Sequence, residues 1–477
     1  VLRVQHLQHG LGGAKDVKLL GREADFLNRF HTHNVQSARV EQLHSFLQLI
    51  PRLWLELFVV SGLTILVVSM LAQDRALVAV VSTLALFAAA TFRIMPSVNR
   101  VLGGVQSLRY GVTVIDWRRD VGDKLCTGIV GQECIRRFPI DSSFIHREVA
   151  SVQAVTPFGG DVRFEAATPQ ARIIDRVAYI ASFAHRAREA GAGYLLGQRV
   201  SAIEPDSRGV TVVTAEGQHR ARAVVLAAGF GSPLTRQLGF GEVTDYVTGV
   251  QAVACARDVD EVQVYLGRDV APGFFAWLVP THGGRALVGL LARRHAQAHL
   301  AAFVGRLETE GKIQGVIGTS SSWGLPLRPL KRTFRDRVLV VGDAAGQIKP
   351  TSGGGIFYSL LASEITAKVL GEALADDDLS SATLSQYQTE WKTLLARELE
   401  IGYSARRLYE YMSDRQVSSL VQQAGSKGIC SDLTGGPDMS FDWHSRIIAR
   451  VMGHPALGSG LRLINPLLAR LACRPDP

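Results

Sequence analysis

The stretch that decides the fold is RVLVVGDAAGQIKPTSGGGIFYSLLASEI, which runs from Arg337 to Ile365. Its first residues form a continuous apolar run that predicts a buried β-strand, and this run ends at Gly342 and Asp343. A loop with one proline and three successive glycines, Gly353–Gly355, then leads into an apolar helical pattern. A buried strand, a carboxylate, a glycine loop and a helix in this order predict an α/β fold.

The same order of elements suits a flat, negatively charged ligand. Asp343, at the carboxyl end of the strand, can accept hydrogen bonds from sugar or ribityl hydroxyls. Gly353, Gly354 and Gly355 let the backbone approach a planar ring, and the next helix directs its N–H groups and positive dipole end toward it. Reduced flavin carries negative charge near N1 and O2, which this arrangement would stabilise. The alternative is a structural turn, in which Asp343 caps the helix and the glycines allow tight packing.

Two other predicted strands end in a similar way. VTVID, residues 112–116, ends in Asp116 and is followed by Trp117 and Arg118, and VVLAAGFGS, residues 224–232, leads into a turn of small residues. In a dinucleotide-binding unit, a terminal acid of this kind hydrogen-bonds the adenosine ribose. A turn aspartate and an ordinary strand exit are the alternatives. The other elements we expect are a helix over about 173–190, strands near 194–200, 209–214, 247–255, 262–266, 274–279 and 286–291, and helices throughout the C-terminal region.

The composition limits the class of protein. A hydrophobic content of 47% over 477 residues excludes a disordered chain. The formal charge of +9 suits anionic partners such as lipid head groups or phosphorylated cofactors, although a basic surface beside a membrane gives the same sum. The five cysteines show neither CxxC nor Cys/His spacing, so we expect a reducing cytoplasmic setting and no metal site. We expect neither a nucleic-acid partner nor a signal peptide.

Two apolar runs near the N-terminus predict membrane helices. LWLELFVVSGLTILVVSMLA, residues 53–72, is long enough to cross a hydrocarbon core of roughly 30 Å. ALVAVVSTLALFAAATF, residues 76–92, predicts a second span. Lysines and arginines precede and follow the pair, which predicts that both ends lie in the cytoplasm. A buried helical hairpin of a large core is the alternative.

A resemblance to a transporter covers about residues 1–111. GLGGAKDVKLLGREADFLNRF, the two apolar runs and RIMPSVNRVLGGVQSLRYG together resemble the last third of an ABC exporter's membrane domain. The chain has no GxxxxGK[ST] phosphate loop, so we expect no ATP-driven transport.

A second resemblance covers about residues 111–465. DKLCTGIVG, GFFAWLVPT and VGDAAGQIKPTSGGGI resemble the geranylgeranyl reductase family, within the flavoproteins of p-hydroxybenzoate hydroxylase fold. It implies an α/β fold: a Rossmann-like FAD-binding domain, here incomplete, with an antiparallel-sheet substrate domain, preceded by an all-α transmembrane hairpin. The domains we expect are 1–110, 111–375 and 376–477.

The resemblance also implies an activity and a set of site residues. Family members bind FAD and reduce C=C bonds of prenyl lipids, with electrons from NADPH or reduced ferredoxin. Cys126 would lie near the flavin ring as the catalytic residue, and Trp277 and Pro280 would line the channel for the lipid. Cys126 as a small buried residue, Trp277 as part of the core and Arg176 as a solvated helix charge are the alternatives. The implied cofactor-binding residues are Asp116, Arg118, Arg176, Gly342, Asp343, Gly353, Gly354 and Gly355.

One expected part of this family pattern is missing. A first strand and a GxGxxG turn should precede residues 112–116, but the chain contains no GxGxxG, and apolar sequence occupies that place. We therefore expect that the strands at 112–116 and 338–342 lose a ladder partner and that FAD binds weakly. Two alternatives stay open: a related flavin-dependent monooxygenase, and an inactive chimeric membrane fragment derived from an ABC transporter. In either active case we expect the catalytic domain on the cytoplasmic side of a membrane.

Overall fold

The computed structural model describes residues 111–122, 126–426, 429–430, 440–455, 457–458 and 468, with isolated positions between residues 61 and 83. Thr113–Pro477 form one compact unit. The predicted spans at 53–72 and 76–92, and the predicted domain 1–110, lie outside the described residues except for those isolated positions. Within the described residues, no helix is both long and apolar enough to cross a membrane.

A seven-stranded sheet forms the larger β-structure of this unit. Its strand order is β16-β12-β15-β14-β13-β4-β5, and all neighbours are antiparallel except β13 and β4. The predicted strand at 262–266 is β13, with the same bounds. The strands are β4 (Ser151–Val155), β5 (Val162–Glu165), β12 (Tyr246–Ala256), β13 (Val262–Leu266), β14 (Phe275–Pro280), β15 (Arg285–Ala292) and β16 (Ile313–Pro326).

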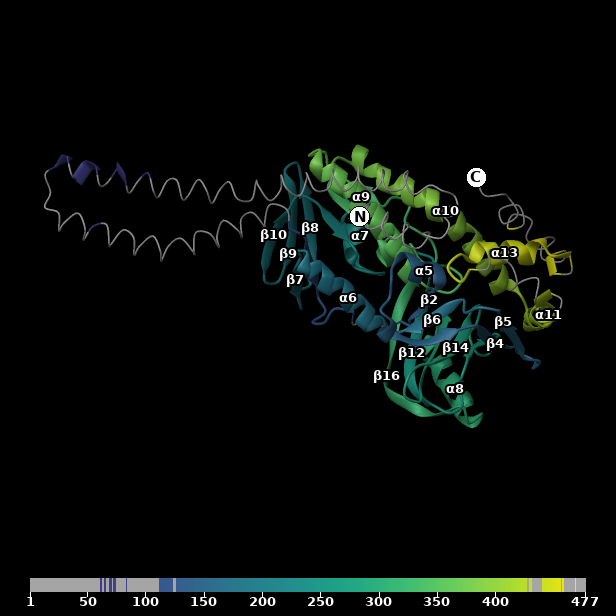
Figure 1. The fold of residues 1–477 in the computed structure, drawn as a ribbon. Coiled ribbons are helices and arrows are strands. Elements are labelled where there is room, and N and C mark those ends of the chain that lie inside the picture. The colour runs from purple at the N-terminus through teal and green to yellow at the C-terminus, as the bar shows by residue number, and fades with distance from the viewer. Residues whose placement is uncertain are drawn as a thin grey trace, which may run out of the picture. The chain divides into compact units, whose positions relative to one another are not determined.

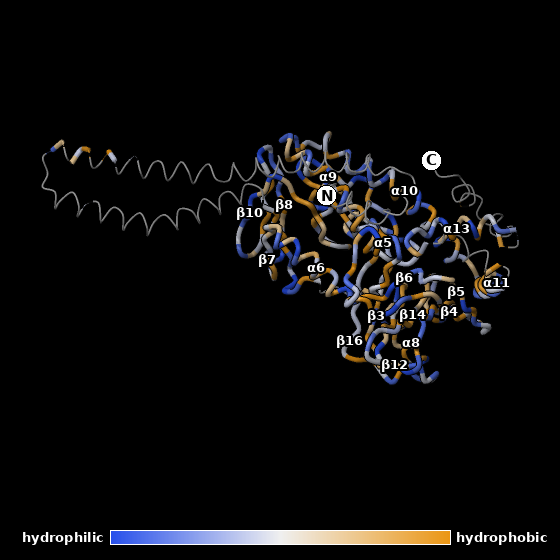
Figure 2. The backbone as a smooth tube through the Cα atoms, in the orientation of Figure 1, coloured by the Kyte–Doolittle hydropathy of each residue, from blue (hydrophilic) through white to orange (hydrophobic). Residues whose placement is uncertain are grey.

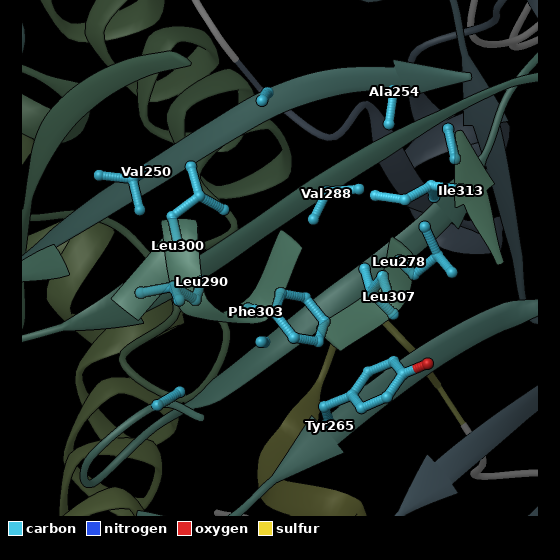
Figure 3. Packing of buried hydrophobic residues seen from close by; sticks show 14 of the residues in the cluster. Val250, Ala254, Tyr265, Leu278, Val288, Leu290, Leu300, Phe303, Leu307 and Ile313 are labelled. Carbon is cyan, nitrogen blue, oxygen red and sulfur yellow. The ribbon is translucent and has the colours of Figure 1, made fainter. Parts of the chain in front are cut away.

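The two faces of this sheet are covered by different elements. Since successive residues of a strand point to opposite faces, Val250, Leu278 and Leu290 share one face, where they pack against α8 (Ala296–Thr309). Figure 3 shows Phe303 of α8 lying among these residues. Residues of the other parity form the second face, which packs toward the glycine loop and which we call the loop face: Val247, Val262, Phe275, Trp277, Val279, Leu291, Trp323 and Leu325.

Several small sheets carry the predicted nucleotide-binding strands and their neighbours. β1 (Thr113–Asp116) pairs in parallel with β7 (Gly193–Leu196), and β11 (Val224–Leu226) pairs in parallel with β18 (Val338–Val340). β18 is buried at every residue, which explains its unbroken apolar sequence. The other small strands are β2 (Ile129–Gly131), β3 (Ile145–Val149), β6 (Ala171–Ile174), β8 (Val200–Asp206), β9 (Gly209–Thr214), β10 (Gly217–Ala221) and β17 (Phe334–Arg335).

The expected loss of a ladder partner at β18 is wrong. β18 pairs with β11 on one side and antiparallel with β17 on the other, because Phe334 returns in a tight hairpin opposite Leu339. Within the described residues, β1 and β18 lie in different sheets, and β7 is the partner of β1.

Helices pack against these sheets and form most of the described part of the chain after residue 355 (Figure 1). α9 follows the glycine loop and packs along the long helix α10 through Leu361, Trp391 and Leu395. Ser380 caps α10 by accepting a hydrogen bond from the Thr383 N–H. Figure 2 shows apolar and hydrophilic segments alternating along these elements. The helices are α5 (Gln132–Arg137), α6 (Arg176–Glu189), α7 (Pro233–Gln237), α9 (Ile356–Ala375), α10 (Ser381–Tyr411), α11 (Asp414–Ala424) and α13 (His444–Gly453), with 3-10 turns η1 (Ser142–Phe144) and η2 (Gly342–Ala344).

Candidate functional site

The glycine loop, residues 346–355, closes on itself through its own backbone. The Lys349 N–H donates to the Gly354 carbonyl at 3.0 Å, and the Gly353 N–H donates to the Lys349 carbonyl at 2.8 Å. Gly353 has φ +73°, a left-handed conformation that glycine adopts without the steric cost of a side chain. Gly354, at the tip, is exposed. At Gly353 and Gly354 the loop therefore presents backbone rather than a side chain.

The structure brings Asp343 and Gly355 together. A Cβ atom on Gly355 would lie 2.8 Å from Asp343 Oδ1 and 3.0 Å from Ile348 Cγ2, so a larger residue would push on the carboxylate. Gly355 is the N-cap of α9, and no side chain caps this 20-residue helix. Its first N–H groups and the positive end of its dipole thus lie beside a half-buried carboxylate and a bare loop.

Buried polar side chains hold the base of the loop. Gly342 has φ +64°, and its N–H donates to Gln347 Oε1 at 2.8 Å. The Gln347 amide donates in turn to the Tyr387 hydroxyl at 2.9 Å, and that hydroxyl donates to the Val340 carbonyl. The loop is therefore fastened to the end of β18 and to α10.

The structure also brings Cys126 and Arg176 to one place, at the start of α6. Arg176 donates from Nη2 to the Gly122 carbonyl at 2.5 Å, and the Gly128 N–H donates to Cys126 Sγ at 3.4 Å. A Cβ atom on Gly128 would lie 2.6 Å from the Ile174 carbonyl oxygen and 3.7 Å from the Arg176 Cβ. Cys126 is half-buried. We call residues 126–131, which continue into β2, the Cys126 segment.

Asp116 and Arg118 form a turn after β1. Asp116 Oδ1 accepts from the Arg118 N–H at 2.9 Å and lies 3.8 Å from Arg118 Nη1. The Arg118 guanidinium stacks over Trp117, whose side chain is 51% exposed. These are the contacts of a turn aspartate, and binding of an adenosine ribose at Asp116 stays a prediction.

Trp277 and Pro280 lie on opposite faces of the seven-stranded sheet. Trp277 is on the loop face, 7% exposed, and its Nε1 donates to Gln251 Oε1 at 3.2 Å. Its indole lies over Gly289, where a Cβ atom would be only 2.4 Å from Cζ2. Pro280, three residues along β14, faces the other way by strand alternation. Their roles in substrate binding stay predictions.

Sequence reasoning missed one buried amide, Gln251, and one segment, residues 440–446, near the site. Gln251 is a single amide in an apolar strand and is 1% exposed, and its Nε2 has no hydrogen-bond partner among the described residues. That isolated polar letter within GVQAVA was a usable signal. The segment of residues 440–446 carries no motif and reaches the loop only through tertiary contacts.

Burial controls protonation beneath the glycine loop. Burial, with the nearby Asp442 carboxylate, raises the pKa of the Cys134 thiol to about 12, so this thiol stays neutral. Burial lowers the pKa of Lys349, and the Asp442 carboxylate opposes that shift. In the described part of the chain, no group of three or more His, Cys, Asp or Glu side chains is placed to hold a metal ion.

Comparison with known proteins identifies the class to which this fold and loop belong. The family model described as FAD dependent oxidoreductase matches residues 116–367, which is more than half of the chain. The chain therefore belongs to the FAD-dependent oxidoreductase family.

The chain is also similar to individual proteins within this class. An uncharacterized protein of Methanocaldococcus jannaschii is 28% identical over 213 residues, 44% of this chain and 54% of that protein, so this chain spans about half of its length. Digeranylgeranylglycerophospholipid reductase 2 of Methanothermobacter thermautotrophicus is 28% identical over 288 residues, 58% of this chain and 74% of that protein. A geranylgeranyl bacteriochlorophyll reductase-like structure from Thermoplasma acidophilum has TM-score 0.65 at 20% identity, and covers 76% of this chain and 96% of that one. The α/β FAD-dependent oxidoreductase fold is thereby confirmed.

Proposed function

We propose that this enzyme reduces isolated C=C bonds of prenyl chains, such as the geranylgeranyl groups of lipids, with FAD as its redox cofactor. The proposal depends on the close packing of the glycine loop against the loop face of the sheet. A Cβ atom on Gly353 would lie 2.9 Å from Leu325 Cδ1 and 3.7 Å from Leu291 Cδ1. A ring that lies on this loop would be next to an apolar wall. The name of the reductase from Methanothermobacter thermautotrophicus supports the same substrate class.

The residues present fit FAD. Asp343 would accept hydrogen bonds from ribityl hydroxyls, and the uncapped N–H groups of α9 would face the electron-rich pyrimidine edge. Gly355 leaves the space that a Cβ atom would fill beside Asp343. Asp116 and Arg118 would hold the adenosine end. When bound, FAD would supply the hydride that reduces the alkene.

The chain's own residues would bind the prenyl group and exclude water. An isolated alkene has no carbonyl to polarise, so the protein needs an apolar wall rather than an oxyanion hole. Trp277, Leu291 and Leu325, which are buried on the loop face, would form such a wall. Cys126 is the group we propose to hold a proton at Sγ for the second alkene carbon, and Arg176 fixes the segment that precedes it through Gly122.

We also propose the arrangement of the rest of the chain. Residues 1–110 would be a membrane segment resembling part of an ABC exporter, with residues 111–375 as the oxidoreductase domain on the cytoplasmic side and residues 376–477 as a helical region. The two apolar runs and their basic flanks support this arrangement. The missing GxGxxG supports weak FAD binding through loss of the first βαβ unit, and NADPH or reduced ferredoxin would be the electron donor.

The test is an anaerobic turnover of a defined prenyl lipid. Protein reconstituted with FAD and reduced chemically should add two hydrogens per alkene, detected by mass spectrometry of the lipid. Asp343→Ala should abolish this product, and Asp376→Ala, an exposed aspartate at the other end of α9, should not. Oxygen-dependent hydroxylation without saturation would favour a monooxygenase. Absence of both products, with no FAD bound, would favour an inactive fragment.

A further inference from the structure

The side chain of Lys349 points away from the outer side of the glycine loop and is almost fully buried. Its backbone makes both hydrogen bonds that close the loop, to Gly353 and Gly354. Its Nζ donates to the Phe441 carbonyl at 2.7 Å and lies 3.7 Å from Asp442 Oδ1. The ammonium also lies 4.9 Å from the centre of the Phe441 ring. The loop is therefore attached to residues far along the chain.

Asp442 uses its other oxygen to hold a second element. Asp442 Oδ2 accepts hydrogen bonds from the Glu133 N–H at 2.9 Å and the Cys134 N–H at 3.0 Å, both in the first turn of α5. The carboxylate is 1% exposed. A buried carboxylate with two backbone donors and a lysine has the partners that its charge requires.

Gly131 leaves the space in which this carboxylate lies. A Cβ atom there would be 2.3–2.5 Å from all three atoms of the Asp442 carboxyl group. Gly131 is the last residue of β2 and of the Cys126 segment, and α5 starts at the next residue. Asp442 thus contacts the chain five residues beyond Cys126.

The neighbours of Asp442 fasten it in place. The Asp442 carbonyl accepts from the Tyr358 hydroxyl at 3.2 Å, and Trp443 donates from Nε1 to Glu133 Oε2 at 2.6 Å. The Ser445 N–H donates to both carboxylate oxygens of Glu398 at 3.1 Å. Residues 440–446, which we call the C-terminal strap, therefore contact α5, α9 and α10 as well as the loop.

We propose that Asp442 is a positioning residue that holds the glycine loop and the Cys126 segment at a fixed separation, through Lys349 on one side and the first turn of α5 on the other. The inference rests on the proposed function for what lies between the two segments: the flavin ring on the loop and the Cys126 thiol beside it. Through this role of Asp442, the C-terminal strap would be part of the cofactor site, although it is far from both segments in sequence.

The experiment compares three single variants and one double variant of the full chain. Asp442→Asn keeps the size of the side chain but puts a neutral amide against Lys349 and α5. Lys349→Met removes the ammonium alone. Arg406→Met is the matched control, because Arg406 is also a buried charge, 4% exposed, and contacts Glu410 and Gly273 instead of either segment.

Two readouts without FAD are hydrogen exchange of residues 346–355 and the alkylation rate of Cys126, located by mass spectrometry. Asp442→Asn should raise both by about tenfold at temperatures where the protein is folded. Lys349→Met should raise exchange in the loop and leave Cys126 alkylation within about twofold, since Asp442 still holds α5. Arg406→Met should lower the melting temperature without raising either.

The third readout is FAD affinity, measured by quenching of flavin fluorescence. Asp442→Asn and Lys349→Met should each weaken FAD binding by about tenfold, and the double variant should be no weaker than Asp442→Asn alone, because both act through one contact. If no variant, nor the unmodified chain, binds FAD, the cofactor part of the proposed function fails while the first two readouts still decide the positioning role. Exchange and alkylation unchanged in Asp442→Asn, or raised equally in Arg406→Met, would overturn the proposal.

Discussion

The indole of Trp277 lies over Gly289 of the neighbouring strand β15, where there is no side chain. Replacing Gly289 with alanine tests whether the position of this indole depends on that free space. The added Cβ would be 2.4 Å from Trp277 Cζ2 and 2.6 Å from the Val250 carbonyl oxygen, whereas ordinary contacts begin at 3.4 Å. Both the indole and a central strand would have to move. The first movement would break the hydrogen bond from Trp277 to Gln251, which would leave both partners of that bond buried and unpaired.

The size of the effect follows from these two contacts. Overpacking a core costs about 1–3 kcal/mol, and losing a buried hydrogen bond costs about 0.5–1.5 kcal/mol. Alanine also lowers the conformational entropy of the unfolded chain, which offsets about 0.4–1 kcal/mol of this destabilisation. We therefore expect Gly289→Ala to lower the free energy of unfolding by about 2–3 kcal/mol.

Urea unfolding, followed by circular dichroism and tryptophan fluorescence, measures this change. The cost of Gly289→Ala should fall by at least about half when Trp277 is leucine, because the closer of the two clashing groups is then gone. The packing would be refuted if Gly289→Ala lowered the free energy of unfolding equally in the Trp277→Leu protein and in the unmodified protein. It would also be refuted if Gly289→Ala did not destabilise the unmodified protein at all.

Three further changes test the loop, a helix and a buried histidine. Gly355→Ala, at φ −112°, adds no backbone strain but displaces the Asp343 carboxylate, so FAD affinity measured by fluorescence titration should fall about tenfold at nearly unchanged melting temperature. Gly371→Ala lies inside α9 with nothing within 4 Å of the new Cβ, and should raise the free energy of unfolding by about 0.5–1 kcal/mol in urea titrations. Burial and the Lys349 cation lower the pKa of His444 to about 3 from 6.5, so below pH 6.5 the unfolded chain binds a proton that the folded chain does not. Stability should therefore fall as the pH is lowered toward 3, and His444→Asn should make urea midpoints at pH 7 and pH 5 more nearly equal than in the unmodified protein.

Local patterns predicted only part of the regular structure, the part that neighbouring residues produce by themselves; they gave no strand for β2 to β6, β10 or β17 and no helix for α5, α7 or α8. Val262–Leu266 was predicted with the bounds that β13 has, and the predicted strands at 247–255, 274–279 and 286–291 differ from β12, β14 and β15 by one residue at each end. β16 escaped prediction because its sequence, IQGVIGTSSSWGLP, has glycines and serines where a strand pattern needs apolar or β-branched residues. Pairing with the full length of β12 imposes that conformation.

The two parts of the candidate site also differ in this way: one follows from local sequence and the other from contacts between distant segments. Asp343 and Gly355 lie close together because one strand, one loop and one helix connect them directly, so the sequence by itself determined that half, together with the α/β class and the FAD chemistry that it implies. The contact of Asp442 with Cys134 joins residues 308 positions apart. Only the tertiary structure decided that contact and the face of the sheet on which Trp277 and Pro280 each lie. These depend on which distant segments bury one another's charges and apolar faces, and no periodicity within a short stretch encodes that choice.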